Sequence, residues 1–262
     1  MRTLRNIINV WKYKELLAEL VKREIKARYK QSILGYAWVV LVPLIHLSVL
    51  TIVFSFLVRI PTGGIPYPVF LFTALVPWMF TSNAISSATS SLLINSALIT
   101  KIYLPREIFP LSAIIAKMVD FALSILILAI ILVYFKIPIH STVFFVPLIL
   151  VVHILLVLGI SFFFSATNVF FRDIENILTV LLTVWMYLTP IIYPPELIPS
   201  NLVTIFNLNP MTGIINAYRN VILHGVAPPL ISFLYATVFS VVVFLTGFIY
   251  FRRRSRYFAD VI

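Results

Sequence analysis

The segment from Glu15 to Pro43 joins a basic amphipathic pattern directly to an apolar run long enough to cross a membrane. Its first half has one apolar helical face, and Lys, Arg and Glu side chains fill the opposite face. Such a helix lies in the membrane interface, with its cations toward headgroups and water. We therefore predict an N-terminal amphipathic interface helix within residues 1–34, with Gly35 as the bend into the first span. Docking of this helix on a soluble partner is the alternative, and the two are compatible.

Apolar sequence dominates the rest of the chain, which is 61% hydrophobic and 11% charged over 262 residues. Soluble domains carry about 25% charged residues, so we predict an all-α integral membrane protein with a single domain. The chain has no cysteine, which excludes disulfides and cysteine metal sites. No cleaved signal peptide is expected, because no apolar core with a small-residue cleavage site follows Met1. Six apolar runs predict six transmembrane helices within residues 36–251: 36–58, 69–93, 111–135, 143–169, 177–192 and 230–251.

The pattern breaks between the fifth and sixth predicted spans, where five prolines lie from Pro190 to Pro210. Asn209 and Pro210 are suited to the N-cap and first position of a helix, and Gly225 is suited to its end. That helix would be about 21 Å long, too short for about 30 Å of hydrocarbon. Residues 190–225 are therefore predicted to form re-entrant helices on the outer side of the membrane.

The distribution of cations predicts the topology. With six spans and both termini cytoplasmic, sixteen Lys and Arg residues lie inside and three outside, namely Arg59, Lys136 and Arg219. This asymmetry agrees with the retention of Lys and Arg in cytoplasmic loops. We predict a multi-pass protein of the cell inner (cytoplasmic) membrane, with residues 252–262 as a cytoplasmic tail. Crossing by residues 210–224 would place the final arginine cluster outside.

Two spans carry polar features. The second predicted span ends in small and weakly polar residues from Thr81 to Ser91, which favour close helix packing; lining a wet cavity is the alternative. The third contains Lys117 and Asp120, which lie three residues apart on one helical face and can pair. A structural pair is favoured over a proton relay.

The sequence contains no recognisable catalytic or cofactor motif. The nine acidic residues form no cluster that predicts a Mg²⁺ site, and the four histidines have no metal-ligand spacing, so neither catalytic residues nor a metal site are predicted. The seven glycines do not form a phosphate-binding Gly-x-x-x-x-Gly-Lys-Ser/Thr loop. No cofactor is expected in this chain, and ATP-driven transport would need a separate ATPase. A membrane enzyme acting on polyprenyl-linked sugars is the alternative from a different class.

Six stretches together resemble the permeases of type-2 ABC exporters for polysaccharides, a class that includes O-antigen, capsule and teichoic-acid exporters. They are LLAELVKREIKARYKQSILGYAWVVLVPL (16–44), FLFTALVPWMFTSNAI (70–85), KIYLPREIFPLS (101–112), FRDIENIL (171–178), TPIIYPPELIP (189–199) and NPMTGIINAYR (209–219). The resemblance implies two permeases working with two ATPase subunits that bind ATP and Mg²⁺. It also implies a lipid-linked polysaccharide passing between the permeases, among membrane lipids and without nucleic acid. O-antigen is the first expectation, with teichoic acid and capsule as alternatives.

The resemblance also implies roles for individual segments. Residues 14–30 correspond to the interface helix, and residues 190–225 to the re-entrant helices. The Asn95–Pro110 segment corresponds to the coupling helix that contacts the ATPase. The expected coupling residues there are Lys101, Ile102, Tyr103, Arg106 and Glu107.

Two sets of side chains suit the expected substrate. Aromatic faces suit sugar C–H surfaces, and an interfacial belt or lipid-facing packing is the alternative role. Arginine and lysine suit a lipid diphosphate at the cytoplasmic face, and positive-inside anchoring is the alternative there. The expected pathway residues are Trp38, Trp78, Phe80, Trp185, Tyr187 and Tyr193, and the expected diphosphate contacts are Arg2, Arg5, Lys26 and Arg28.

Overall fold

The computed structural model describes residues 13–29, 34–35, 37–102 and 104–261, and the secondary structure of these parts is helical. In chain order the elements are α2 (Lys14–Tyr29), α3 (Ala37–Thr51), η1 (Ile52–Leu57), α4 (Tyr67–Ile94), α5 (Ser96–Lys101), α6 (Ile108–Tyr134), η2 (Ser141–Phe145), α7 (Val146–Phe170), α8 (Ile174–Tyr187), η3 (Pro195–Leu197), α9 (Val203–Asn207), α10 (Pro210–Arg219), η4 (Asn220–His224), α11 (Leu230–Arg254), η5 (Ser255–Tyr257) and α12 (Phe258–Val261).

Five helical stretches in the described residues are long and apolar enough to cross a membrane: 37–57, 67–94, 108–134, 141–170 and 230–257. The predicted fifth span, residues 177–192, differs. Its helix, α8, has 14 residues and ends at Tyr187, which gives it a length of about 21 Å. Pro190 accounts for the early end, because it lacks an N–H and disfavours helical geometry at the preceding residue.

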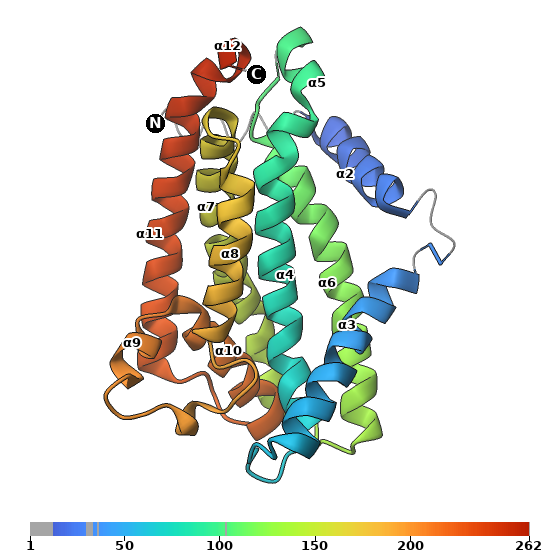
Figure 1. The fold of residues 1–262 in the computed structure, drawn as a ribbon, viewed down its shortest axis with the longest axis vertical. Coiled ribbons are helices and arrows are strands. Elements are labelled where there is room, and N and C mark those ends of the chain that lie inside the picture. Colours follow the sequence, from blue (N-terminus) through green and yellow to red (C-terminus); the bar gives the residue numbers. More distant parts are fainter. Residues whose placement is uncertain (1–12, 30–33, 36, 103, 262) are drawn as a thin grey trace.

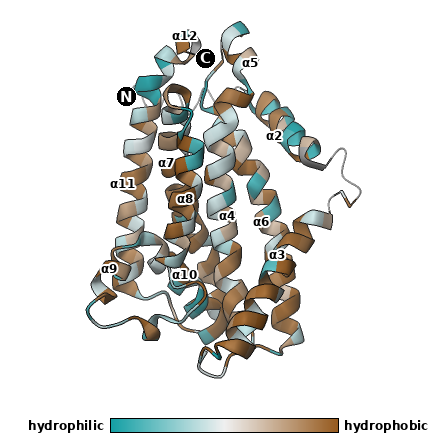
Figure 2. Ribbon diagram, viewed as in Figure 1, coloured by the Kyte–Doolittle hydropathy of each residue, from teal (hydrophilic) through white to brown (hydrophobic). Residues whose placement is uncertain are grey.

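The long helices form a bundle in which α4 packs against α6 and α7, and α7 packs along α11 (Figure 1). The short helices α5 and α12 lie together with α2 toward one end of the bundle, and α9 and α10 lie at the other. We call these the α5 end and the α10 end. Hydrophilic residues gather on α2 and at the α5 end, whereas apolar residues cover most of the bundle (Figure 2).

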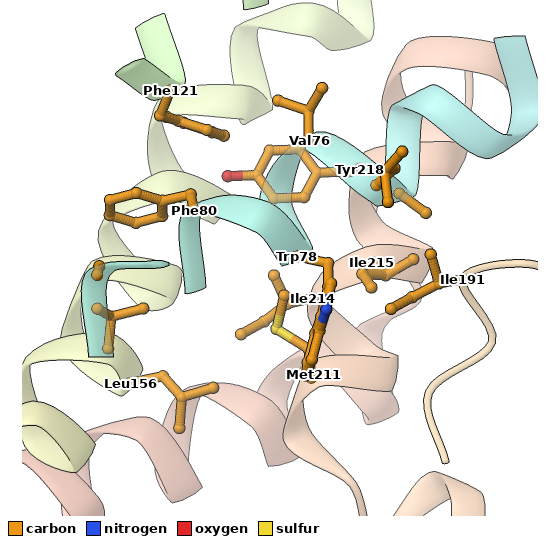
Figure 3. Close-up of a cluster of buried hydrophobic side chains, with 14 of the residues drawn as sticks. Val76, Trp78, Phe80, Phe121, Leu156, Ile191, Met211, Ile214, Ile215 and Tyr218 are labelled. Atoms are coloured by element: carbon orange, nitrogen blue, oxygen red, sulfur yellow. The ribbon is translucent and has the colours of Figure 1, made fainter. Parts of the chain in front are cut away.

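Helix α4 contributes most to the interior of the protein. It is the most buried of the five long stretches, and its side chains join a large apolar core with α6, α7 and α10. Figure 3 shows part of this core, where Trp78 of α4 lies beside Met211 and Ile214 of α10. Pro77 lies inside α4, where it removes one backbone hydrogen bond of the helix. A smaller core lies at the α5 end, around Phe109, Phe251 and Phe258.

The crossing of α7 and α11 depends on two glycines. A Cβ atom added to Gly247 would lie 2.1 Å from the carbonyl oxygen of Gly159. A Cβ atom on Gly159 would lie 2.5 Å from the backbone nitrogen of Phe244. Glycine at both positions therefore allows the two backbones to touch, as small residues do between membrane helices.

Candidate functional site

One asparagine joins α8 to α10 at the α10 end. The side-chain oxygen of Asn209 accepts hydrogen bonds from the Met211 backbone N–H at 3.0 Å and from Trp185 Nε1 at 2.8 Å. Its amide nitrogen donates to the Leu188 carbonyl at 3.1 Å and to Thr189 Oγ1 at 2.8 Å. The predicted N-cap is confirmed, and the same side chain also fixes the end of α8.

The predicted end of this helical segment is also confirmed. Helix α10 continues as η4 to His224, and Gly225 follows with a φ angle of 66°, in the left-handed region that glycine accepts. Gly35 has a φ angle of 50°, which likewise suits its predicted place at a bend. A Cβ atom at Gly225 would also lie 2.5 Å from the His140 ring, so glycine is needed there for space as well.

Arg219 lies in the interior, although the sequence placed it among the outer cations. Its side chain is 3% exposed, and it donates to the carbonyls of Pro190 at 2.6 Å and Ile191 at 2.7 Å. Its guanidinium lies 3.7 Å from the centre of the Phe70 ring, a cation–π contact. Sequence reasoning missed this role. The sequence did contain a signal for burial. Arg219 lies four residues after Ile215, so both side chains lie on the apolar face of the helix.

Tyr67 completes this connection between α4 and the chain that follows α8. Its hydroxyl donates to the carbonyl of Ile192 at 2.9 Å. Three consecutive carbonyls, from Pro190 to Ile192, are therefore bonded by side chains from α4 and α10. This connection, which we call the carbonyl clamp, holds an irregular backbone segment whose polar groups need partners inside an apolar core.

The six predicted pathway residues are distributed over several environments. Trp78 and Trp185 form an edge-to-face pair with ring centroids 5.5 Å apart, and Trp78 is buried. Tyr193 donates from its hydroxyl to the Tyr187 carbonyl at 2.7 Å, and burial raises the pKa of Tyr193. Trp38 is 40% exposed. Within the described residues, Trp78 and Trp185 thus form a ring pair, and Tyr193 is joined to the backbone of Tyr187 by a hydrogen bond.

A cavity of about 310 Å³ lies between α3, α4 and α6. Trp38 and Phe80 are among its lining residues, so it brings together two of the predicted pathway residues. Lys117 and Asp120 also line it, with Nζ 3.9 Å from Oδ2, which confirms the predicted pairing. Phe80 also packs against Phe121, another lining residue, with ring centroids 4.9 Å apart.

The predicted coupling segment forms the tip of the α5 end. Helix α5 covers Ser96–Lys101, and Lys101 and Ile102 are exposed, whereas Tyr103 lies outside the described residues. Asn95, just before α5, accepts a hydrogen bond from Arg23 of α2 and donates to the Ser91 carbonyl at 2.7 Å. The tip of the bundle is therefore bonded directly to α2.

The other two predicted coupling residues contact the C-terminal part of the chain. Glu107 lies 3.6 Å from Arg252 at the end of α11. The Arg106 guanidinium lies 5.9 Å from the ring of Phe258 in α12. The loop between α5 and α6 is thus joined to the C-terminal helices, and the residue before α5 is joined to α2.

The predicted diphosphate contacts lie mainly outside the described part of the structure. Arg2 and Arg5 fall outside it, as does the side chain of Arg28, while Lys26 is exposed on α2. On the same helix, the hydrogen bond from Lys22 holds the pKa of Glu19 below its usual value. The diphosphate role stays a prediction.

The family follows from the sequence match over most of this fold. Residues 15–223, from α2 through most of η4, match the ABC-2 type transporter family. The chain belongs to this family. This ABC-2 transporter protein therefore carries α4, α5 and α10 within the matched region.

Curated relatives of this ABC-2 transporter protein cover nearly its whole length. The O-antigen export system permease protein RfbA of Myxococcus xanthus is 30% identical over 99% of this chain and 100% of the relative. The protein of the same name from Klebsiella pneumoniae is 31% identical over 95% of each chain. The polysialic acid transport protein KpsM of Escherichia coli is 25% identical over 90% of this chain and 92% of the relative.

Proposed function

We propose that this ABC-2 transporter protein is the membrane-spanning permease of an ATP-driven exporter of lipid-linked polysaccharide, with O-antigen as the substrate class. The full-length similarity to two O-antigen export permeases carries this proposal. The weaker similarity to a polysialic acid transport protein supports capsule polysaccharide as the second candidate. The transporter would work as two permeases with two ATPase subunits in the inner membrane.

The proposed topology has six spans, with α8 and the segment after it as the fifth crossing. Helix α8 begins just after α7 and runs beside it to the α10 end, as the ribbon in Figure 1 shows. The helix is short, but in the carbonyl clamp the carbonyls of the irregular backbone that follows it accept hydrogen bonds from side chains. This topology leaves α2 and α12 on one side, which the cation distribution favours as the cytoplasm. Residues 190–225 would then be the re-entrant outer segment.

The α5 end is the proposed contact with the ATPase. Its exposed tip at Lys101 and Ile102 is bonded through neighbouring residues to α2 and the C-terminal helices. Movement of the ATPase would therefore reach the interface helix and the spans together. The proposed sugar pathway comprises Trp38, Trp78, Phe80, Trp185, Tyr187 and Tyr193. The basic N-terminal region is the proposed contact of the lipid diphosphate.

Deletion and complementation test the function. A strain without this chain should lose long-chain surface polysaccharide and accumulate it inside, as seen by gel staining and by labelling of intact cells. Complementation should restore surface display. The tagged chain should co-purify with an ATPase subunit, and export into inverted vesicles should require ATP. Unchanged surface polysaccharide after deletion would contradict the proposal.

A further inference from the structure

The cavity between α3, α4 and α6 places a charged pair at membrane depth. Lys117 and Asp120 lie nine and twelve residues after the start of α6 at Ile108, which corresponds to about 14 and 18 Å along the helix. Their side chains are 13% and 25% exposed. Ionisable groups within the hydrocarbon layer are costly and commonly line substrate paths or water-filled cavities. Because this pair lies on a cavity wall, a ligand can reach it, whereas a ligand cannot reach a fully buried structural pair.

The chemistry of the wall selects the kind of ligand. Lys117 supplies donors and Asp120 supplies acceptors, while Asn83 of α4 supplies both. A sugar hydroxyl both donates and accepts, so it can bond to both members of the pair. A phosphate has no such match, because Asp120 lies 3.9 Å from Lys117 and cancels its attraction for an anion.

Aromatic and apolar side chains form the rest of the wall. Trp38 and Phe80 line the cavity with Val42, Pro43 and Met79. Aromatic rings suit the C–H faces of a sugar ring, and Trp adds a polar edge. The combination of rings with a donor–acceptor pair is therefore suited to a neutral sugar more than to a hydrocarbon chain, which offers the pair no hydrogen bonds.

Beyond Asn83, which lines the cavity, α4 carries further small polar side chains toward the α5 end. Asn83 and Ser86 are exposed and Ser90 is half-buried, and their spacing of three and four residues puts them on one helical face. The buried residues Ala84, Ala88 and Ser91 occupy the packed side of the same stretch. Close packing is therefore confirmed for the buried face of this segment, whereas Asn83 is its residue on the cavity wall.

We propose that this cavity is a binding subsite for one neutral sugar unit, in which Lys117, Asp120 and Asn83 bond the hydroxyls and Trp38 and Phe80 contact the ring. The inference rests on the proposed function, since it names where the exported polymer is held. It assigns a role to a charged pair that the sequence favoured as structural.

Paired substitution separates binding from structural pairing. The double variant Lys117→Met/Asp120→Leu removes both charges together, and apolar replacement of such a pair is neutral or stabilising for the fold. We expect unchanged thermal stability and a fall of about tenfold in ATP-dependent export into inverted vesicles, the factor produced by losing one hydrogen bond to a charged group. The control Thr246→Leu, at an exposed position of α11, should export at the parental rate. Full export by the stable double variant would overturn the proposal.

A single substitution separates sugar from phosphate as the ligand. Asp120→Asn leaves the positive charge of Lys117 in place, so a phosphate site would be strengthened and a hydroxyl site weakened. We expect slower export at normal stability. Faster export, or tighter retention of lipid-linked substrate by this variant, would overturn the sugar assignment.

Cross-linking in cells tests the location directly. Val42→p-benzoylphenylalanine places a photoreactive group on the cavity wall, and Leu126→p-benzoylphenylalanine places one at an exposed position of α6 outside the lining. We expect adducts that carry glycan, detected by carbohydrate staining, at position 42 and not at position 126. Adducts of lipid alone at position 42, or glycan adducts equal at both positions in exporting cells, would overturn the subsite. Surface polysaccharide that does not depend on the chain would instead refute the proposed function.

Discussion

Gly247→Ala should destabilise the protein at the crossing of α7 and α11. The added Cβ would lie 2.1 Å from the Gly159 carbonyl oxygen, 2.9 Å from its carbonyl carbon and 3.2 Å from its Cα. All three are backbone atoms, so no side-chain rotation relieves the overlap. Ordinary contacts of a Cβ atom begin at 3.4 Å. The helices must therefore separate by about the difference between 3.4 Å and the 2.1 Å distance to the Gly159 carbonyl oxygen.

The geometry sets the size of the effect. The shortfall is about 1.3 Å, and a radial gap of 0.5–1 Å already loses a quarter to a half of each dispersion contact. Overpacking of well-packed interiors costs about 1–3 kcal/mol and occasionally more. Because backbone meets backbone here, we expect a loss of about 3 kcal/mol. Gly159→Ala strains the same crossing, so the double variant should lose less than the sum of the two single losses.

Reversible unfolding of the purified chain in mixed micelles, followed by far-ultraviolet circular dichroism, measures this free energy. Thr246→Ala is the matched control on the adjacent residue, because Thr246 is exposed and its hydroxyl bonds to the Val242 carbonyl of its own helix at 2.8 Å. The control should stay within about 0.5 kcal/mol of the parent. If Gly247→Ala also stays within that range, the close crossing does not exist as described.

Three further predictions concern both ends of the bundle. Arg219→Met leaves two buried carbonyls without donors and should cost about 3 kcal/mol of unfolding free energy, whereas Arg219→Lys should lose less; equal losses would argue against the two-carbonyl geometry. Asn209→Ala should cost about 2 kcal/mol and shift tryptophan emission as Trp185 loses its acceptor, while unchanged emission would contradict that bond. Lys101→Glu with Ile102→Ser should abolish substrate-stimulated ATPase activity and export at normal thermal stability, and normal coupling would exclude the α5 tip as the ATPase contact.

Local rules predicted the parts of the fold that depend on nearby residues. The helix from Pro210 to His224 was predicted between its Asn cap and Gly225, and Lys117 and Asp120 were predicted to pair from their spacing. Each depends on residues within a few positions along the chain. The coupling segment was instead expected from the family resemblance, and its helix, α5, covers Ser96–Lys101.

Long-range contacts account for what the sequence did not predict. Arg219 is buried because its acceptors lie 28 and 29 residues away, at Ile191 and Pro190. Its charge alone suggested an exposed position. The fifth span was predicted to end at Ile192 because the residues up to that point are apolar. Hydropathy alone does not show that Pro190 ends the helix earlier. For the candidate site, Trp38 and Phe80 were predicted as pathway residues, but the cavity that they share was not. That cavity depends on how α3, α4 and α6 pack together.

Helix α4 is connected to different partners at its two ends. Near one end, Asn95 bonds to the amphipathic α2, and at the other, Tyr67 and Phe70 contact the carbonyl clamp. Its 28 residues form a rod of about 42 Å. A push on α5 that travels along this rod reaches Pro77 before the clamp, and bending is easiest where a proline has removed a hydrogen bond. A force applied at one face of the membrane would therefore change the angle between the two halves of α4, with Pro77 as the hinge.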